Sequence, residues 1–272
     1  MNQRERLDRL VDAFLQDSGY TDIRPGKDEK QQRDLLRSLM NVRLPKKTDP
    51  DTLRIQDEYL QERNRERGIV DVSALPTVRE EGSALKHGDR ICLWQGDITR
   101  CRADAIVNAA NEEMLGCFIP MHTCIDNCIH TYAGIQLRQE CDRQMTGYRK
   151  IYGKTYVQPT AVPMLTGGYN LPAKHVIHVV GPIVRGRLSD RERKQLGQCY
   201  TGVLDLCREN GLRDVVFCCI STGVFRFPSE EAAGIAVETV SSWLDSDPGA
   251  IERVVFNVFK DEDREIYRKR LF

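Results

Sequence analysis

The sequence predicts an α/β domain preceded by a helical N-terminal extension, and two observations support this. Up to about Gly88 the chain is highly charged, and its apolar residues recur at three- and four-residue steps, which is typical of amphipathic helices. After Gly88 the pattern changes to short, continuous apolar runs that alternate with Gly-containing turns and helical stretches. We therefore expect an extension over residues 1–88 and an α/β domain over residues 89–272.

Three helices are predicted in the extension. The first carries an apolar stripe that consists of Leu7, Leu10, Val11, Phe14 and Leu15. The second runs from about Asp28 to Met40, and the third begins near Asp49. The stretch 69–88 has no sustained period and contains Pro76, which indicates a connector. We expect the helices to pack on the domain, although they could instead recognise a partner protein.

Five strands and three helices are predicted in the domain. The strands cover Ile91 to Gln95, Ala105 to Val107, His175 to Val180, Val215 to Ile220 and Val254 to Phe259. The helices cover about Asp126 to Arg143, Lys194 to Asn210 and Ser229 to Trp243. Because the strands are mostly continuous apolar runs rather than alternating ones, we expect helices to cover both faces of the sheet.

The composition favours a soluble cytoplasmic protein. Lys plus Arg and Asp plus Glu both number 40, so the formal net charge is zero and nothing indicates binding to nucleic acid or to a membrane surface. The first ten residues are too charged for a signal peptide, and no segment has the roughly 20 apolar residues of a membrane span. Ten cysteines in a chain of this length fit a reducing compartment, and the balanced charge permits a monomer.

Ligands of open α/β sheets bind at the carboxyl ends of the strands, and the first predicted strand ends in Gly96-Asp97-Ile98-Thr99. The Asp97 carboxylate could accept a hydrogen bond from an exocyclic amine such as that of adenine. A turn or helix-capping role is the simpler interpretation of this residue when it is taken alone.

The second strand runs into two asparagines in Ile106-Val107-Asn108-Ala109-Ala110-Asn111. An amide side chain offers donors and acceptors without charge, which suits ribose hydroxyls. Asparagines near a strand end are also common turn formers.

A third segment, Ser221-Thr222-Gly223-Val224-Phe225-Arg226-Phe227-Pro228, precedes the helix predicted from Ser229. Its small residues leave backbone N–H groups open to an anion near a helix N-terminus, and Phe225 offers an apolar face to a sugar or a base. A glycine in such a loop is weak evidence by itself.

Together these three segments, in this order, resemble the macrodomain family. The resemblance covers about Gly88 to Phe272 and implies a three-layer α/β/α fold with a mixed central sheet and a cleft for ADP-ribose. It implies that Asp97, with Ile98 beside it, holds the adenine and that Asn111 holds the distal ribose. It further implies that the diphosphate and ribose are bound by Ser221, Thr222, Gly223, Val224 and Phe225.

Potential metal ligands follow the asparagines. Cys117, His122 and Cys124 lie within eight consecutive residues, and Zn²⁺ prefers thiolate and imidazole ligands. Three protein ligands leave a fourth position open to water or substrate, which favours a catalytic site. Cys128, one helical turn after Cys124, could instead close the site, and most buried cysteines are inert apolar residues.

The macrodomain family usually has a Gly-rich run at this place, followed by a Val-Asp pair that opens a helix. Its replacement here resembles the zinc-containing macrodomains of certain bacteria and fungi, which also carry an N-terminal helical extension. This resemblance implies one Zn²⁺ per chain and catalytic roles for Asn111 and Asp126, which stands at the Asp of that pair. Asp126 could alternatively be a first-turn acid favoured by the helix dipole, oriented by His130 one turn later.

The resemblance implies a zinc-dependent hydrolase that removes mono-ADP-ribose from Asp or Glu side chains of a modified protein. Zinc-containing members are linked with a sirtuin-like ADP-ribosyltransferase and with a lipoylated carrier that resembles the glycine-cleavage H protein. Two alternatives remain open: a reader that binds ADP-ribose without turnover, and a deacetylase of O-acetyl-ADP-ribose. The presence of both Asn111 and Asp126 favours hydrolysis.

Overall fold

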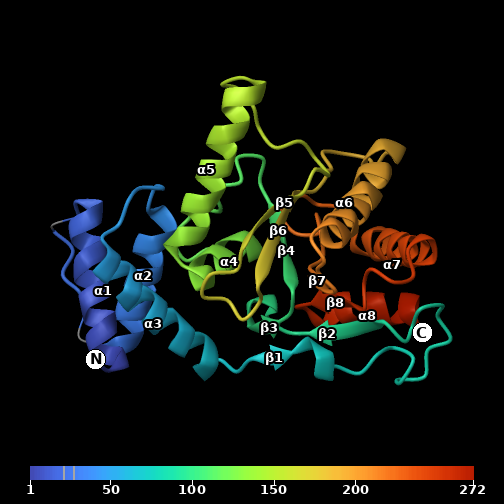
Figure 1. The fold of residues 1–272 in the computed structure, drawn as a ribbon, viewed down its shortest axis with the longest axis horizontal. Coiled ribbons are helices and arrows are strands. Elements are labelled where there is room, and N and C mark those ends of the chain that lie inside the picture. The colour runs from blue at the N-terminus through green and yellow to red at the C-terminus, as the bar shows by residue number, and fades with distance from the viewer. Residues whose placement is uncertain (21, 27) are drawn as a thin grey trace.

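The computed structural model describes residues 1–20, 22–26 and 28–272, and its N-terminal part is a group of three helices (Figure 1). These are α1 (Gln3–Ser18), α2 (Glu29–Val42) and α3 (Pro50–Glu66). Each begins at a polar cap: the side chains of Asn2, Asp28 and Asp49 accept from backbone N–H groups of the first turn. The expected apolar stripe of α1 is buried, and these helices form a hydrophobic cluster that includes Ile135 of the domain. Packing on the domain, as predicted, is therefore confirmed.

A six-stranded mixed sheet forms the centre of the domain. Its strands are β2 (Ile91–Gln95), β4 (Ala105–Ala110), β5 (Met164–Gly167), β6 (His175–Val180), β7 (Asp214–Phe217) and β8 (Arg253–Val258). Their order is β2-β8-β7-β4-β6-β5, and every neighbouring pair is parallel except β5 with β6. A separate two-residue parallel pairing joins β1 (Val70–Asp71) to β3 (Cys101–Arg102). The carboxyl ends of five strands therefore meet at one edge of the sheet.

Helices cover both faces of this sheet, as the continuous apolar strands predicted. They are α4 (Ile125–Ala133), α5 (Ile135–Tyr152), α6 (Asp190–Glu209), α7 (Ser229–Ser246) and α8 (Asp261–Leu271). Figure 1 shows α4 and α5 on the side of the N-terminal helices, and α6 and α7 on the opposite side. Aromatic pairs fix α6 and α8 to the strands: the rings of Tyr200 in α6 and Phe217 lie 5.0 Å apart, and the rings of Tyr267 in α8 and Phe256 lie 5.2 Å apart.

The single helix expected from Asp126 to Arg143 is wrong, because two helices meet at Gly134. Gly134 has φ +96°, in a region that side chains disfavour, and it is the C-cap of α4 and the N-cap of α5. The predicted strand from Ala105 extends to Ala110, which places Asn108 inside the strand. The predicted strand from Val215 ends earlier, at Phe217. Strand β5 and helix α8 were not predicted.

The larger hydrophobic cluster contains the sheet and its helices, and it also takes in Val72 and Val78 from before Gly88. The division of the chain at residue 88 stays a prediction, and these two side chains pack with the part that follows it. Within the described residues, no helix is both long and apolar enough to cross a membrane.

Candidate active site

All three segments singled out in the sequence lie at the carboxyl edge of the parallel strands. Asp97 follows β2, the loop from Ser221 follows β7, and Asn111 follows β4. Strands β2, β8, β7 and β4 are consecutive in the sheet, so the segments line up along one edge in that order. This is the edge at which open α/β sheets bind ligands.

Asn111 and Asp126 are brought together by β4 and the first turn of α4. The Asn111 Nδ2 donates to Asp126 Oδ2 at 3.2 Å and to the carbonyl of Gly116 at 3.1 Å. Asn108, which is fully buried in β4, donates its Nδ2 to Asp126 Oδ1 at 2.8 Å. Asp126 lies in the first turn of α4, as the simpler interpretation expected, and its carboxylate is directed at the two asparagines.

Burial is the largest cause of the pKa shifts of Asp126 and His130. Desolvation raises the pKa of Asp126 to about 6, although the hydrogen bonds from Asn108 and Asn111 favour the ionised form. His130 lies one turn later with its Nε2 3.5 Å from Asp126 Oδ1. Burial, together with the nearby His178 and Arg138, holds the pKa of His130 well below its ordinary value, so the ring is neutral. Neither ring nitrogen of His130 has a hydrogen-bond partner among the described residues.

A buried hydrogen-bond chain continues from Asn108 into the core. Its Nδ2 also donates to His178 Nδ1 at 3.0 Å, and His178 Nε2 lies 3.0 Å from the hydroxyl of Thr166. Burial lowers the pKa of His178 to about 3, so the neutral ring accepts at Nδ1 and donates at Nε2. The Thr166 hydroxyl in turn donates to the carbonyl of Val176 at 3.3 Å. In this series of hydrogen bonds each group donates to the next, from Asn108 to the carbonyl of Val176. Both N–H bonds of Asn108 are therefore oriented, one towards Asp126 and one towards His178.

Cys117, His122 and Cys124 form a cluster whose ligand atoms all lie within 4.8 Å of one another. The Cys117 Sγ is 3.5 Å from His122 Nδ1, and all three residues are half-buried. Desolvation raises the pKa of Cys124 to about 12, and the neighbouring Cys117 adds to this shift. Two thiols and an imidazole at this spacing fit a divalent cation, since a cation would stabilise both thiolates at once. The three residues that the sequence indicated as potential metal ligands therefore lie close together.

Cys128 is not part of this cluster. Its Sγ lies 3.7 Å from a guanidinium nitrogen of Arg37, which belongs to α2 of the extension. The same nitrogen donates to the carbonyl of His122 at 2.7 Å and to Asn127 Oδ1 at 2.9 Å. The Nδ2 of Asn127 donates to the carbonyls of Cys117 and Ile119. The loop that carries the cluster is thus held by both the extension and α4.

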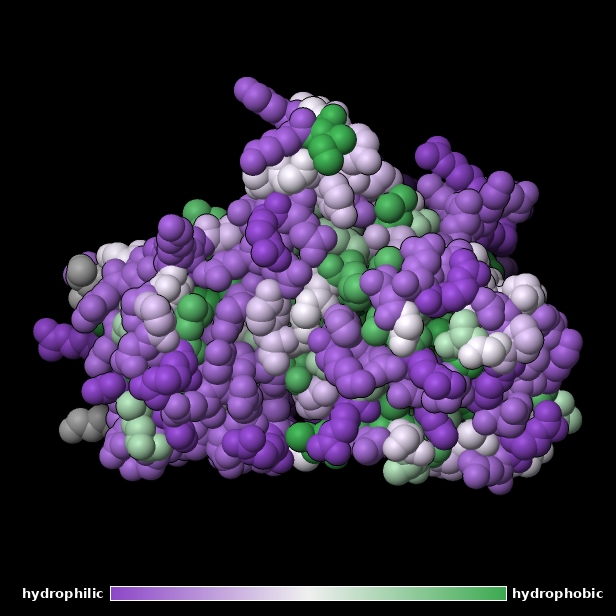
Figure 2. Space-filling view, viewed as in Figure 1, coloured by the Kyte–Doolittle hydropathy of each residue, from purple (hydrophilic) through white to green (hydrophobic). Residues whose placement is uncertain are grey.

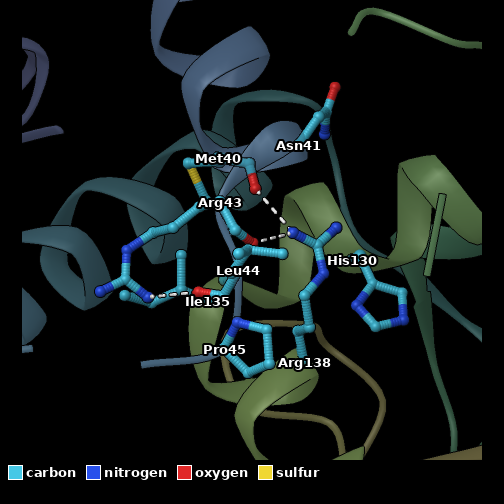
Figure 3. A pocket seen from close by; sticks show the side chains of 9 residues that line it. Met40, Asn41, Arg43, Leu44, Pro45, His130, Ile135 and Arg138 are labelled. Carbon is cyan, nitrogen blue, oxygen red and sulfur yellow. Dashed lines mark hydrogen bonds between the residues drawn. The ribbon is translucent and has the colours of Figure 1, made fainter. Parts of the chain in front are cut away.

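A second arginine joins the extension to the same region (Figure 3). Arg138 of α5 is buried, and its guanidinium donates to the carbonyls of Met40 and Arg43 at the end of α2, at 3.1 and 2.5 Å. It also donates to the carbonyl of Leu115, at 2.7 Å, just before the cluster. Burial lowers the pKa of Arg138 to about 10. A small cavity of about 10 Å³ lies beside it, with His130 on its wall.

The loop from Ser221 has the open backbone that the sequence indicated. Within the part of the chain that the structure describes, the N–H groups of Gly223, Val224 and Phe225 have no hydrogen bond. Val224 is 73 % exposed, whereas Phe225 is half-buried against the core. Ser221 is buried at φ +67°, and its Oγ has no partner among the described residues. The hydroxyl of Thr222 is already bonded to the carbonyl of Cys219.

Asp97 has the capping role that the simpler interpretation expected. Its Oδ1 accepts from the backbone and hydroxyl of Thr99, at the start of the short helix η2 (Ile98–Arg100). Its Oδ2 forms an ion pair with Arg67, at the end of α3, whose guanidinium lies 3.4 Å from the centre of the Tyr132 ring. Ile98 is buried, so it can offer a ligand its backbone N–H rather than its side chain.

Phe259 is a candidate that the sequence analysis missed, because it was counted as the last residue of a strand. It lies just past β8, the neighbour of β2, and its ring is 74 % exposed. Its carbonyl accepts from Gln95 at the end of β2. An aromatic residue at the carboxyl end of a buried strand is the signal that could have identified it.

This site and fold define a class of protein. A sequence model of the Macro domain family matches residues 107–236. A relative from Treponema medium, a protein-ADP-ribose hydrolase by name, is 47 % identical over 99 % of this chain and 99 % of its own length. The chain therefore belongs to the macrodomain family.

The similarity extends over the N-terminal extension. A protein of the same name from Staphylococcus aureus (strain MSSA476) is 40 % identical over 98 % of this chain and 90 % of its own. Among solved structures, the Trypanosoma brucei macrodomain in complex with ADP-ribose is similar with a TM-score of 0.65 and 29 % identity. That match covers 86 % of this chain and 94 % of the other. The ADP complex of an Oceanobacillus iheyensis macrodomain is 33 % identical, with a TM-score of 0.58, over 67 % of this chain and 90 % of the other.

Proposed function

We propose that this protein is a hydrolase that removes mono-ADP-ribose from a modified protein. The observation that carries the proposal is the contact between Asn111 and Asp126 at the carboxyl edge of the sheet, beside a cluster of potential metal ligands. A reader of ADP-ribose needs neither a buried carboxylate nor a metal. The names of the relatives from Treponema medium and Staphylococcus aureus support the same activity.

ADP-ribose would lie along the edge that joins the three segments. The adenine fits between Asp97 and the exposed ring of Phe259, where the carboxylate can accept from its amine. The free N–H groups of Gly223, Val224 and Phe225 suit the diphosphate, with Ser221 and Thr222 directly before them in the loop. The distal ribose then reaches Asn111. The complex of the Trypanosoma brucei macrodomain with ADP-ribose supports a ligand of this kind.

The reaction needs a water molecule and a group that takes its proton. In the proposed step the oxygen of water bonds to the anomeric carbon of the distal ribose, and the bond from that carbon to the side-chain oxygen breaks. The Asp126 carboxylate accepts the proton that the water loses, while the released side chain leaves as a carboxylate. Asn111 orients the ribose, and the hydrogen bond from Asn108 holds the carboxylate of Asp126 in position.

The proposal includes one Zn²⁺ per chain, held by Cys117, His122 and Cys124. The half-buried donors and their mutual distances support this assignment, and the position of Cys128 against Arg37 favours three protein ligands. Held by these three residues, Zn²⁺ would supply Lewis-acid chemistry, polarising an oxygen and stabilising negative charge on it. The chain's part is to hold the three donors through Arg37 and Asn127 and to keep them beside Asp126. Because both thiols must stay reduced, we place the protein in the cytoplasm. A formal net charge of zero is compatible with the proposed monomer.

Esters of Asp and Glu side chains are the proposed substrates, because a carboxylate is a good leaving group. By resemblance to zinc-containing macrodomains, the modified protein would be a lipoylated carrier similar to the glycine-cleavage H protein, modified by a sirtuin-like transferase. A relative from Fusarium oxysporum, a probable bifunctional ADP-ribose hydrolase/ADP-ribosyltransferase by name, supports a link between the two activities. It matches 87 % of this chain and 40 % of its own.

The test measures release of ADP-ribose from a protein mono-ADP-ribosylated on Asp or Glu, together with zinc content of the same sample. We expect turnover by a protein that contains about one zinc, and loss of both in Cys117→Ala/Cys124→Ala. Cys128→Ser is the matched control, and it should keep its zinc. Binding of ADP-ribose without release would identify a reader, and full activity without metal would identify a metal-independent hydrolase. Cleavage of O-acetyl-ADP-ribose alone would identify the deacetylase.

A further inference from the structure

The C-terminal end of α5 carries an exposed surface that the proposed chemistry does not use. We call it the α5 tip, and it consists of Tyr148, Lys150, Ile151, Tyr152, Lys154 and Tyr156. In Figure 1 this end of α5 projects beyond the rest of the domain, and in Figure 2 it stands out from the surface with a hydrophobic patch on it. Ile151 is 73 % exposed and Tyr152 is 66 % exposed.

The aromatic part of the α5 tip is ordered by its own packing. The rings of Tyr152 and Tyr156 are stacked at 5.1 Å, and the ring of Tyr148 lies 5.7 Å from Tyr156. Tyr152 stays largely exposed in spite of this packing. Tyrosines held in a fixed arrangement lose little conformational entropy on binding, and they are enriched at protein interfaces for that reason. The α5 tip therefore has the character of a preformed contact surface.

The base of the α5 tip is joined to the turn that follows Asn111. Arg149, which lies between Tyr148 and Lys150 of the tip, forms a salt bridge of 2.6 Å with Glu113, two residues after Asn111. The irregular segment after the tip returns to the same turn, because the N–H of Gln158 donates to the carbonyl of Glu112 at 2.9 Å. A protein whose modified side chain reaches Asn111 therefore approaches the turn to which the base of the α5 tip is attached.

The charge of the α5 tip is positive. Lys150 and Lys154 are exposed, and neither forms a salt bridge with any carboxylate in the described ranges. Arg149 is already neutralised by Glu113. Two unpaired ammonium groups around exposed Ile151 and Tyr152 suit a surface that combines carboxylates with apolar side chains.

We propose that the α5 tip is the docking surface for the protein part of the substrate, and that it selects an acidic and apolar sequence around the ADP-ribosylated residue. This inference rests on the proposed function, since it assigns a surface to the substrate of that site. The edge of the sheet binds the ADP-ribose group, which is the same for every modified protein. The α5 tip supplies the contact that distinguishes one modified protein from another.

The test uses two ADP-ribosyl-glutamate peptides of equal length, one with Asp and Leu residues around the modified residue and one with Gly and Ser. We expect the intact protein to bind the acidic apolar peptide about tenfold more tightly by fluorescence anisotropy, and to hydrolyse it with a correspondingly lower KM. Ile151→Ser/Tyr152→Ser and Lys150→Glu/Lys154→Glu should each remove most of this preference. Their affinity for free ADP-ribose should stay within about twofold of the parent protein.

Leu44→Ser and Lys47→Glu/Lys269→Glu are matched controls at exposed positions elsewhere, and they should keep the preference. Equal binding of the two peptides by the intact protein, or an unchanged preference in both tip variants, would overturn the docking surface. Anisotropy needs no turnover, so docking is tested even if no ADP-ribose is released. Absence of release with intact peptide preference would contradict the hydrolase and leave the docking surface standing.

Discussion

The guanidinium of Arg37 donates a 2.7 Å hydrogen bond to the backbone carbonyl of His122, which joins a helix of the extension to the loop that carries Cys117, His122 and Cys124. Removing this guanidinium should loosen the loop that holds Cys117, His122 and Cys124 without changing these three residues themselves. We expect Arg37→Ala to weaken zinc binding about 10- to 100-fold, as loss of supporting contacts around a metal does. Competition with a chelator measures this, and Arg33→Ala on the same helix is the control. Equal zinc affinity in both variants would contradict a supporting role for the extension.

Asn108 supports the carboxylate of Asp126 from inside the strand, out of reach of a ligand. In Asn108→Ala the carboxylate loses its 2.8 Å hydrogen bond and its fixed orientation. We expect kcat to fall at least about tenfold while the affinity for ADP-ribose changes less than about threefold. Single-turnover kinetics and calorimetry separate the two effects. Loss of binding in proportion to kcat would show that Asn108 only stabilises the fold, and Asn210→Ala at an exposed helix end serves as the control.

Arg67 and Asp97 should act as a unit at the nucleotide end of the site. Their ion pair fixes the carboxylate that is proposed to accept from adenine. We expect Arg67→Ala and Asp97→Ala each to weaken ADP-ribose binding about tenfold, and the double variant to lose little more. Calorimetry of the four proteins measures this coupling, with Arg65→Ala as an exposed control. Fully additive losses would argue that the two residues act independently.

Arg138 is expected to be the most important single contact between α5 and the extension for stability. Its guanidinium bonds to three carbonyls, two of them at the C-terminal end of α2, where a positive charge is also favoured by the helix dipole. Arg138→Met leaves these carbonyls without a donor and should lower the free energy of unfolding by about 3 kcal/mol. Urea unfolding measures the change. Arg143→Met, on the same helix but exposed, should cost less than about 0.5 kcal/mol.

Asp17 should make stability depend on pH in acid. Partial burial alone would raise its pKa, but hydrogen bonds from Lys46 and Arg43 hold the pKa below its ordinary value. A lowered pKa stabilises the folded state above the unfolded value of about 3.9, and this contribution is lost as the pH falls through the folded pKa. Asp17→Asn should therefore cost about 1 kcal/mol at pH 7, and the difference from the parent protein should shrink towards pH 3. A constant difference between pH 7 and pH 3 would contradict the assignment.

The parallel strands and the segments at their ends could be predicted because both depend on local sequence. Short apolar runs such as Val254 to Phe259 predict buried strands. In open α/β sheets the ligand-binding residues directly follow such strands in the sequence. The break at Gly134 was missed, since apolar residues continue at helical spacing on both sides of it. Strand β5 is short and lies on the sheet edge, and α8 is too polar for periodicity to identify it.

The contacts that hold the site could not be predicted, because they join residues far apart in the sequence. Arg37 reaches His122 across 85 positions, and nothing near either residue indicates the other. The same holds for Arg67 with Asp97, which the sequence analysis treated as a residue for adenine alone. Asn108 was read as part of a loop, whereas its place inside β4 gives it the contact with Asp126. The position of each ligand-facing residue is local, but its orientation depends on the tertiary fold.

The break at Gly134 separates two tasks that a continuous helix would have coupled. The segment before the joint directs Asp126 at the sheet, and the segment after it carries the exposed tyrosines outward. Inserting or deleting one turn near the far end of α5 would change the reach of those tyrosines by about 5.4 Å and leave the first segment where it is. With the docking role proposed for the α5 tip, a change in helix length alone would alter which proteins are accepted, while Asn111 and Asp126 stay where they are.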